Sequence, residues 1–192
     1  MLKGLAVLVS ILAVHSWAAA QIEDGNLIVP GERIGAYKLG VTGAALREHL
    51  GPPQNLGPGA NPTLAATGWT FGPPGQRWAL VALVRRATDQ VVALLLQGTG
   101  DATRFRTAEG VALGTSLQTA WQVYGTPSFR WLLSDRTGFI VAVYDRSGLA
   151  IGGYTQLGVP LPVPANTVYY VRVFPAGSAD DLWPASQIPR MP

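Results

Sequence analysis

The chain has 192 residues but no cysteine, only two histidines and few charged side chains. Without cysteine it cannot form a disulfide framework, a zinc-thiolate site, an iron–sulfur cluster or a cysteine nucleophile. Charged residues make up 13% of the sequence, against about 25% in an average globular protein. Hydrophobic residues make up 48%, which is too many for a disordered chain. The length predicts one ordinary domain or two small ones.

Positive charge is scattered along the sequence. The formal net charge is +3, but the basic residues occur as isolated pairs such as Arg85-Arg86 and Arg104 with Arg106. Nucleic-acid-binding domains gather such residues into a continuous patch or stripe. We therefore expect no nucleic-acid partner.

The first twenty residues have the pattern of a secretory signal peptide. A basic start at Lys3 precedes an apolar run over residues 5–14, and three alanines at 18–20 supply the small residues required for cleavage. The alternative is a membrane anchor, but the run to Ala20 contains His15 and Ser16 and is short for a span of about 20 residues. We therefore predict a signal peptide over 1–20 and cleavage before Gln21. The mature protein would be soluble, periplasmic or extracellular, and without stable membrane insertion.

The most informative feature is an internal repeat. Leu39-Gly40-Val41-Thr42 is followed by Leu50-Gly51-Pro52-Pro53, and Leu113-Gly114-Thr115-Ser116 by Tyr124-Gly125-Thr126-Pro127. Thr42 and Ser116 are favoured N-cap residues, whose hydroxyl oxygens accept hydrogen bonds from the first helical turn. Gly51 and Gly125 suit the left-handed position after a helix, and the prolines that follow prevent its continuation. The blocks therefore predict helices over 43–50 and 117–124.

Apolar, β-branched-rich runs follow each helix. The sequence predicts antiparallel hairpins over 78–86 with 91–97 and over 139–145 with 149–155. Flanking strands are expected around 68–71 and 103–107 in the first copy, and around 129–133 and 168–174 in the second. The predicted fold is α+β: two tandem repeats, each a short helical segment plus about four antiparallel strands, form one curved sheet with helices on one face. The repeats would span 21–101 and 102–174, followed by an extended Pro-rich tail over 175–192.

The glycine and cap pattern resembles a known family. Arg106 to Ser116, running on to Tyr124-Gly125-Thr126-Pro127, is similar to the repeat of secreted β-lactamase-inhibitor-like proteins and of SmpA/OmlA-type (BamE-like) envelope proteins. Residues 34–53 resemble the companion copy. The resemblance implies a curved sheet with an open concave face, and a protein-binding or scaffold role rather than catalysis. SmpA/OmlA-type members are single-repeat lipoproteins, whereas this chain is duplicated and lacks the lipid-bearing cysteine, so no binding residue is carried over.

Residues suited to catalysis are sparse. His49 lies within the first predicted helix, and its counterpart in the second copy is Val123, which favours a half-buried structural position. Asp180-Asp181 could meet a cation, but no further ligands accompany them. We predict no catalytic, cofactor or metal site, and keep a carboxylate hydrolase as a less favoured alternative. Carboxylate pairs for such an enzyme could come from the acidic residues Asp101, Glu109, Asp135 and Asp145.

The central predicted strands are apolar on both faces, whereas a sheet with one solvated face should alternate apolar and polar residues. The second face therefore needs a cover, for which the sequence leaves four alternatives: the tail with Trp183, the loop 54–67, a second copy of the chain or an external partner. Aromatic and arginine side chains on these strands are typical of recognition surfaces. Candidate recognition residues are Trp69, Trp78, Trp131, Tyr144, Tyr170 and Arg172. The competing interpretation places them in the core of a thicker sandwich.

These features favour a secreted or periplasmic, non-catalytic binding or scaffold module that recognises a protein partner of the cell envelope on its sheet face. The alternative is a cell-wall or carbohydrate-binding module that uses Trp69, Trp78 and Trp131 as aromatic platforms. Two of these rings would then have to be exposed and coplanar. Homo-oligomer formation is left open by the sequence.

The signal peptide gives a direct prediction. When the complete sequence is expressed in a bacterium, we expect the accumulated protein to begin at Gln21, because the small residues before it fit signal peptidase. Intact-mass and N-terminal measurements on the periplasmic and medium fractions check this. Recovery of the uncleaved chain in the membrane fraction would contradict it.

Overall fold

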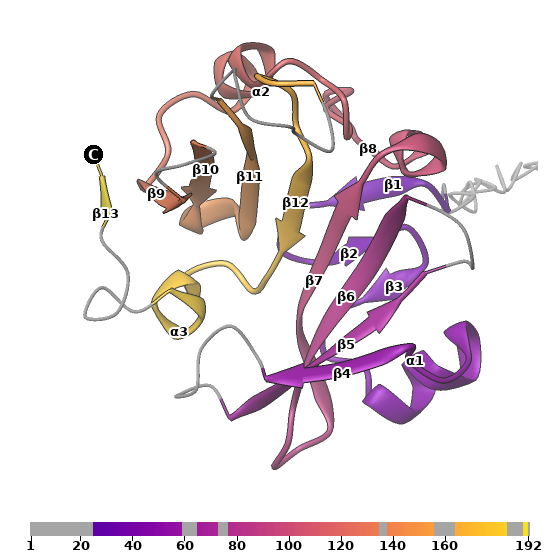
Figure 1. Ribbon diagram of the computed structural model, residues 1–192. Coiled ribbons are helices and arrows are strands. Elements are labelled where there is room, and N and C mark those ends of the chain that lie inside the picture. The colour runs from indigo at the N-terminus through magenta and orange to yellow at the C-terminus, as the bar shows by residue number, and fades with distance from the viewer. Residues whose placement is uncertain are drawn as a thin grey trace, which may run out of the picture.

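The computed structural model describes residues 25–58, 65–72, 77–134, 138–155, 164–183 and 190–191 (Figure 1). The predicted signal peptide, Asp135 and most of the loop and tail prolines lie outside these residues. Within the described part of the chain, no helix is both long and apolar enough to cross a membrane.

A nine-stranded antiparallel sheet forms the body of the protein. Its centre is the pairing of β12 with β7, which places Val171 opposite Leu96 and Arg172 opposite Leu95. On each side of this junction four strands follow one another in chain order as a meander, and β13 is added at one edge beside β9. The spatial order is β13 (Arg190–Met191), β9 (Phe129–Ser134), β10 (Phe139–Tyr144), β11 (Leu149–Tyr154), β12 (Tyr170–Val173), β7 (Gln90–Gly98), β6 (Trp78–Arg85), β5 (Ala66–Phe71) and β4 (Asn55–Pro58).

A second, smaller sheet corrects the expectation of one curved sheet. It has the order β3 (Tyr37–Lys38), β2 (Arg33–Ile34), β1 (Leu27–Val29) and β8 (Arg106–Thr107), and its β1–β8 pair is parallel. The two predicted repeats therefore interlock here, because β1 precedes the first helix and β8 precedes the second. Pairing between such distant segments leaves no local signal in the sequence.

The strands expected in the first copy are partly wrong. Residues 103–107 do not form a strand beside β7; they are divided between the 3-10 helix η2 (Gly100–Arg104) and β8 in the smaller sheet. Gly98 and Gly100 both have positive φ, at 124° and 73°, so the chain turns away after β7. The strand flanking β5 is instead β4, which lies within the expected loop 54–67.

The two predicted helices are confirmed with their bounds. They are α1 (Gly43–Leu50) and α2 (Leu117–Tyr124). Thr42 Oγ1 accepts from the Ala45 N–H at 3.1 Å, and Ser116 Oγ accepts from the Thr119 N–H at 3.4 Å. Gly51 and Gly125 follow the helices with positive φ, at 77° and 69°, which favours glycine; their ψ of −171° and −144° differs from the expected left-handed helical conformation.

One face of the large sheet packs against α1, α2 and the small sheet. Leu46 of α1, Leu117 of α2 and Ile34 of β2 are buried in one cluster with strand residues such as Leu94 and Ile151. Such short helices do not persist alone in water. Burial of their apolar sides against the sheet is what stabilises them.

The opposite face packs against the C-terminal segment. A third helix, α3 (Ala179–Leu182), and Trp183 after it are buried with Phe129, Phe174 and Val141. The segment is anchored because the Ala179 N–H donates to Asp145 Oδ1 at 2.9 Å. The tail is therefore laid across the body, but it is not extended throughout, and a helix lies on each face of the sheet rather than on one.

Trp183 gives a test of this packing. It is completely buried, and its ring centre lies 5.3 Å from that of Phe174 and 6.4 Å from that of Trp131. We expect Trp183→Ala to reduce the free energy of unfolding by about 3–5 kcal/mol, measured by urea denaturation. The control is Gln122→Ala on the exposed side of α2, which should change it by less than about 0.5 kcal/mol. Equal, small effects would contradict a core role for the tail.

Candidate functional site

The six residues expected to form one recognition surface do not lie together. Trp69 and Tyr144 are buried on the face covered by α1 and α2, whereas Tyr170 and Arg172 are buried on the face covered by α3. Trp78 and Trp131 are half-buried, again on opposite faces. The surface as predicted is therefore wrong, because successive strand residues point to opposite faces and both faces are covered. The thicker-sandwich interpretation describes these residues better.

The three tryptophans do not form an aromatic platform. Trp69 lies under α1 with the Arg47 guanidinium 4.7 Å from its ring centre. Trp78 packs edge-on against Phe105 at 6.1 Å, and Trp131 lies against Trp183. Carbohydrate binding through these rings therefore loses its structural basis.

The residues considered for catalysis are dispersed. His49 is exposed on α1, and Asp101 is exposed in η2. Asp145 binds the backbone of the C-terminal segment, which is a structural role. Among the residues that the structure describes, no group of three or more His, Asp or Glu side chains could hold a metal ion, and this includes Asp180 and Asp181.

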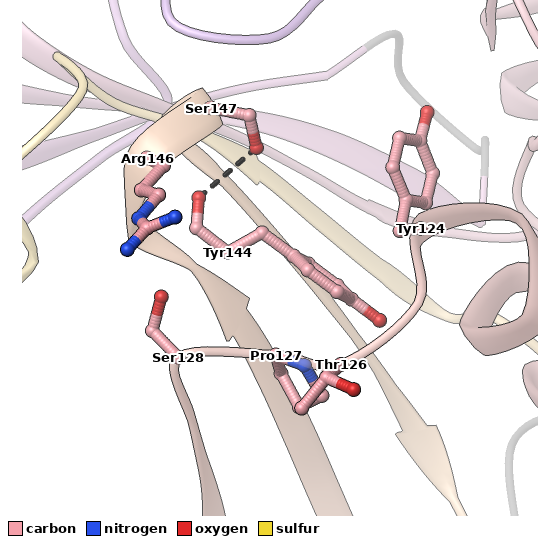
Figure 2. A pocket seen from close by; sticks show the side chains of 7 residues that line it. All are labelled: Tyr124, Thr126, Pro127, Ser128, Tyr144, Arg146 and Ser147. Atoms are coloured by element: carbon pink, nitrogen blue, oxygen red, sulfur yellow. Dashed lines mark hydrogen bonds between the residues drawn. The ribbon is translucent and has the colours of Figure 1, made fainter.

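An open pocket of about 520 Å³ lies where α2, β10 and the turn η3 (Asp145–Ser147) meet (Figure 2). The local sequence builds it: Gly125 ends α2, Pro127 directs the chain into β9, and η3 reverses the chain after Tyr144. Five of its seven lining residues carry a hydroxyl group, and one is an arginine. The lining consists of Tyr124, Thr126, Pro127, Ser128, Tyr144, Arg146 and Ser147.

Hydrogen bonds within the pocket leave one buried hydroxyl group unpaired. The Tyr124 hydroxyl donates to Glu109 Oε2 at 2.8 Å, and Ser147 Oγ donates to the Tyr144 carbonyl at 3.0 Å. The Tyr144 hydroxyl is buried and has no hydrogen-bond partner among the described residues. The Tyr144 ring centre lies 5.5 Å from that of Tyr124, and in Figure 2 the Tyr144 hydroxyl points toward Thr126 and Pro127. A ligand that supplies a hydrogen-bonding group would satisfy this hydroxyl.

The charges of the pocket follow from burial and hydrogen bonding. Burial raises the pKa of Tyr144 to about 12, partly offset by Arg130, and burial also raises the pKa of Tyr124. The hydrogen bond from Tyr124 lowers the pKa of Glu109. At neutral pH both phenols are therefore protonated donors and Glu109 is ionised. This arrangement suits recognition by hydrogen bonding.

Sequence reasoning singled out only Tyr144 of these residues. The sequence predicts Tyr124, Thr126 and Pro127 only as the end of a helix and the turn that follows it, and Arg146 as part of a hairpin turn. The sequence feature that could have indicated these pocket residues is the number of hydroxyl-bearing side chains at the two turns. The position at which the turns meet depends on the fold.

Comparison with known proteins leaves the family open. No family model matches the chain, and no curated protein matches it. A crystal structure of a cysteine-rich secretory protein from Staphylococcus aureus subsp. aureus Mu50 is similar at 11% sequence identity and a TM-score of 0.45. That match covers 80% of this chain and 48% of the other, so the chain spans about half that protein's length. Similarity at this level assigns neither a family nor a function.

The contact between Tyr124 and Glu109 can be tested by substitution. We expect Tyr124→Phe to raise the pKa of Glu109 toward its ordinary value of 4.5, because the largest cause that lowers it is removed. Carboxyl-carbon NMR titration measures this. Tyr144→Phe is the matched control and should leave the Glu109 pKa unchanged. A response of Glu109 to both variants alike would contradict the assigned hydrogen bond.

Proposed function

We propose that the protein is an exported, non-catalytic binding module that recognises a protein partner of the cell envelope through the pocket of Tyr124, Tyr144 and Arg146. The observation that carries the proposal is this open pocket, which is lined by Tyr144, whose buried hydroxyl is unpaired, and by an exposed arginine. Tyrosine and arginine are enriched at the energetic centres of protein interfaces. The proposed site thus moves from the sheet face to the junction of α2, β10 and η3.

Exposed apolar side chains on the two elements that the pocket's loop joins support a protein partner. Val123 is 42% exposed on α2, and Leu132 is 37% exposed on β9, the two elements joined by the pocket's loop. The Arg130 guanidinium lies 5.6 Å from the Trp121 ring centre and links the same two elements. Apolar, aromatic and arginine groups, which α2 and β9 carry between them, are the residue types that interfaces favour.

We also infer that the chain consists of two tandem repeats over 21–101 and 102–174, related to the β-lactamase-inhibitor-like and BamE-like family. Equal helices with the same caps support this, as do the four-strand meanders that follow them. In this strand order, β4–β7 of the first repeat correspond to β9–β12 of the second. The sequence instead matches the hairpin of β6 and β7 with that of β10 and β11, so the correspondence is shifted by one strand. A protein-binding role agrees with what the resemblance implies.

A saccharide of the cell wall is the second candidate ligand, and one observation favours it. Hydroxyl groups line most of the pocket beside two tyrosine rings. Pockets of this kind bind polar ligands through a few placed hydrogen-bonding groups and apolar ring faces. The pocket, rather than the tryptophans, would then hold the sugar.

The test is affinity capture with matched variants. The processed full-length chain is used as bait on solubilised cell envelope and on wall fragments, beside Arg146→Glu and the remote exposed control Arg86→Glu. We expect a defined protein to bind the wild type and Arg86→Glu, and to bind Arg146→Glu at least tenfold more weakly. Enrichment of wall saccharide with the same variant dependence would favour the second candidate.

Direct affinity measurement on the captured ligand then decides the site. Tyr144→Phe should weaken binding several-fold, because it removes only the unpaired hydroxyl. Equal affinity of wild type, Arg146→Glu and Tyr144→Phe would contradict a role for the pocket. Turnover of the ligand would contradict the non-catalytic assignment.

A further inference from the structure

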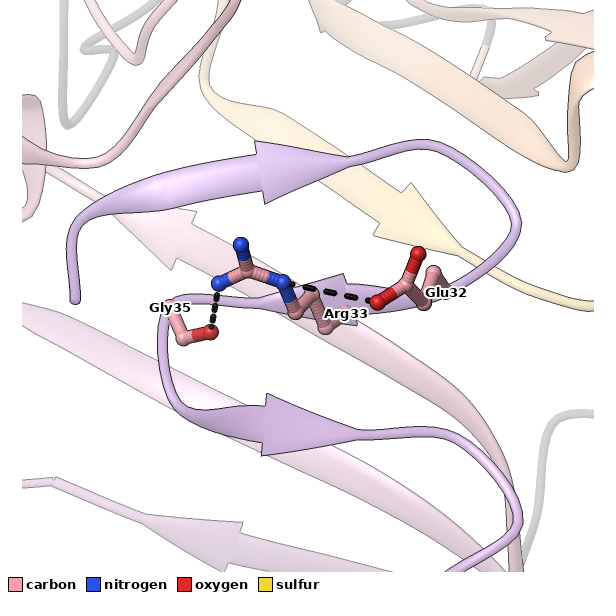
Figure 3. Close-up of polar contacts among 3 residues, drawn as sticks. All are labelled: Glu32, Arg33 and Gly35. Atoms are coloured by element: carbon pink, nitrogen blue, oxygen red, sulfur yellow. Dashed lines mark hydrogen bonds and ion pairs between the residues drawn. The ribbon is translucent and has the colours of Figure 1, made fainter. Parts of the chain in front are cut away.

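Two arginines are buried among the residues that the structure describes, and they differ in their partners. Arg33 Nη1 donates to the Gly35 carbonyl at 2.8 Å, and its Nε lies 3.6 Å from Glu32 Oε1 (Figure 3). Its charge is therefore matched by a carboxylate of the chain itself, although its Nε makes no hydrogen bond. Buried charges are normally paired in this way.

Arg172 has no such partner. It lies on β12, the central strand of the large sheet, and is only 6% exposed. Its Nε and Nη1 are buried without a hydrogen-bond partner, and so is the hydroxyl of Tyr170, two residues earlier on the same face. Three polar atoms are thus unpaired on two neighbouring side chains.

Aromatic rings flank the Arg172 guanidinium. Its carbon lies 4.8 Å from the Trp183 ring centre and 5.3 Å from that of Tyr170. Its register neighbours are Ala150 and Leu95, both buried and apolar. The ring faces attract the cation electrostatically. They do not provide hydrogen-bond acceptors for the N–H groups of the guanidinium.

Neutralising Arg172 by loss of a proton is not available, because a guanidinium stays protonated in proteins. Among the described residues, no carboxylate forms an ion pair with it; the ion pair found there is Arg33 with Glu32. An unpaired buried charge costs several kcal/mol. An anion from outside the chain would remove that cost.

We propose that Arg172 and Tyr170 bind the carboxylate of a small apolar acid on the α3-covered face of the sheet. The guanidinium donates to the carboxylate and the Tyr170 hydroxyl donates a further hydrogen bond. A singly charged carboxylate fits this environment better than a phosphate dianion, whose desolvation cost rises with charge. The apolar surroundings, Leu95 and Trp183 among them, receive the hydrocarbon part of the acid.

This site is independent of the proposed function. The Tyr144 pocket lies on the face covered by α2, whereas Tyr170 and Arg172 lie on the other face. A ligand here and a partner there could bind together. Failure of one proposal therefore leaves the other standing.

The test is titration of the processed full-length chain with octanoate, octanol, acetate and inorganic phosphate. Tryptophan fluorescence and the melting temperature report binding, since Trp183 lies against Arg172. We expect octanoate to raise the melting temperature in a concentration-dependent way and to change the fluorescence. Acetate, phosphate and octanol should each act at least tenfold more weakly, because each lacks either the apolar chain or the carboxylate.

Matched variants assign the response to the site. Arg172→Met should abolish the octanoate response, and Tyr170→Phe should weaken it about tenfold. Arg86→Met, at an exposed arginine outside both proposed sites, is the control and should retain it. Since Arg172→Met removes an unpaired charge, we expect it to fold; if it does not, Tyr170→Phe decides. No octanoate response in the wild type, an equal response to octanol or phosphate, or an unchanged response in Tyr170→Phe would overturn the proposal.

Discussion

A sheet whose central strands are apolar on both faces must be covered on both, and the rest of this structure depends on that constraint. Along β10, Val141 and Val143 face one side while Ala142 and Tyr144 face the other, and all are buried. Water can be excluded from both sides only if separate parts of the chain supply the covers. The small sheet with α1 and α2 covers one face, and the C-terminal segment with Trp183 packs on the other.

Much of the fold could be predicted from local signals in the sequence. The elements that form by pairing between distant segments could not. Thr42, Ser116 and the glycines after each helix predicted both helices with their bounds, because caps are decided within a turn. Most strands were likewise predicted from runs of apolar residues. The parallel pairing of β1 with β8 had no such signal. The same limit applies to the candidate site: the sequence leaves open whether Tyr170 and Arg172 are exposed or lie in the core, because the packing of Trp183 on that face is a non-local contact.

Because the predicted recognition residues are buried or half-buried, the proposed binding site for a protein partner does not lie across a face of the sheet. The sheet serves as a scaffold. The groups proposed to bind a partner lie at or beyond the ends of its strands, at the turn η3 and the end of α2. Tyr144 connects the two roles, since its ring is part of the core while its hydroxyl is left unpaired beside an open pocket. Arg172 presents the corresponding case on the other face. In both places the proposed ligand is argued from the unsatisfied polar group rather than from the apolar surface around it.

The central claim is that the C-terminal segment is part of the folded core. Hydrogen exchange of the Trp183 backbone amide, which donates to the Ala179 carbonyl at 2.7 Å, tests it most directly. If the segment unfolds only with the whole domain, this amide should exchange as slowly as the amides of β10 and β11, and with the same dependence on denaturant. Exchange orders of magnitude faster, as for a frayed terminus, would contradict the account.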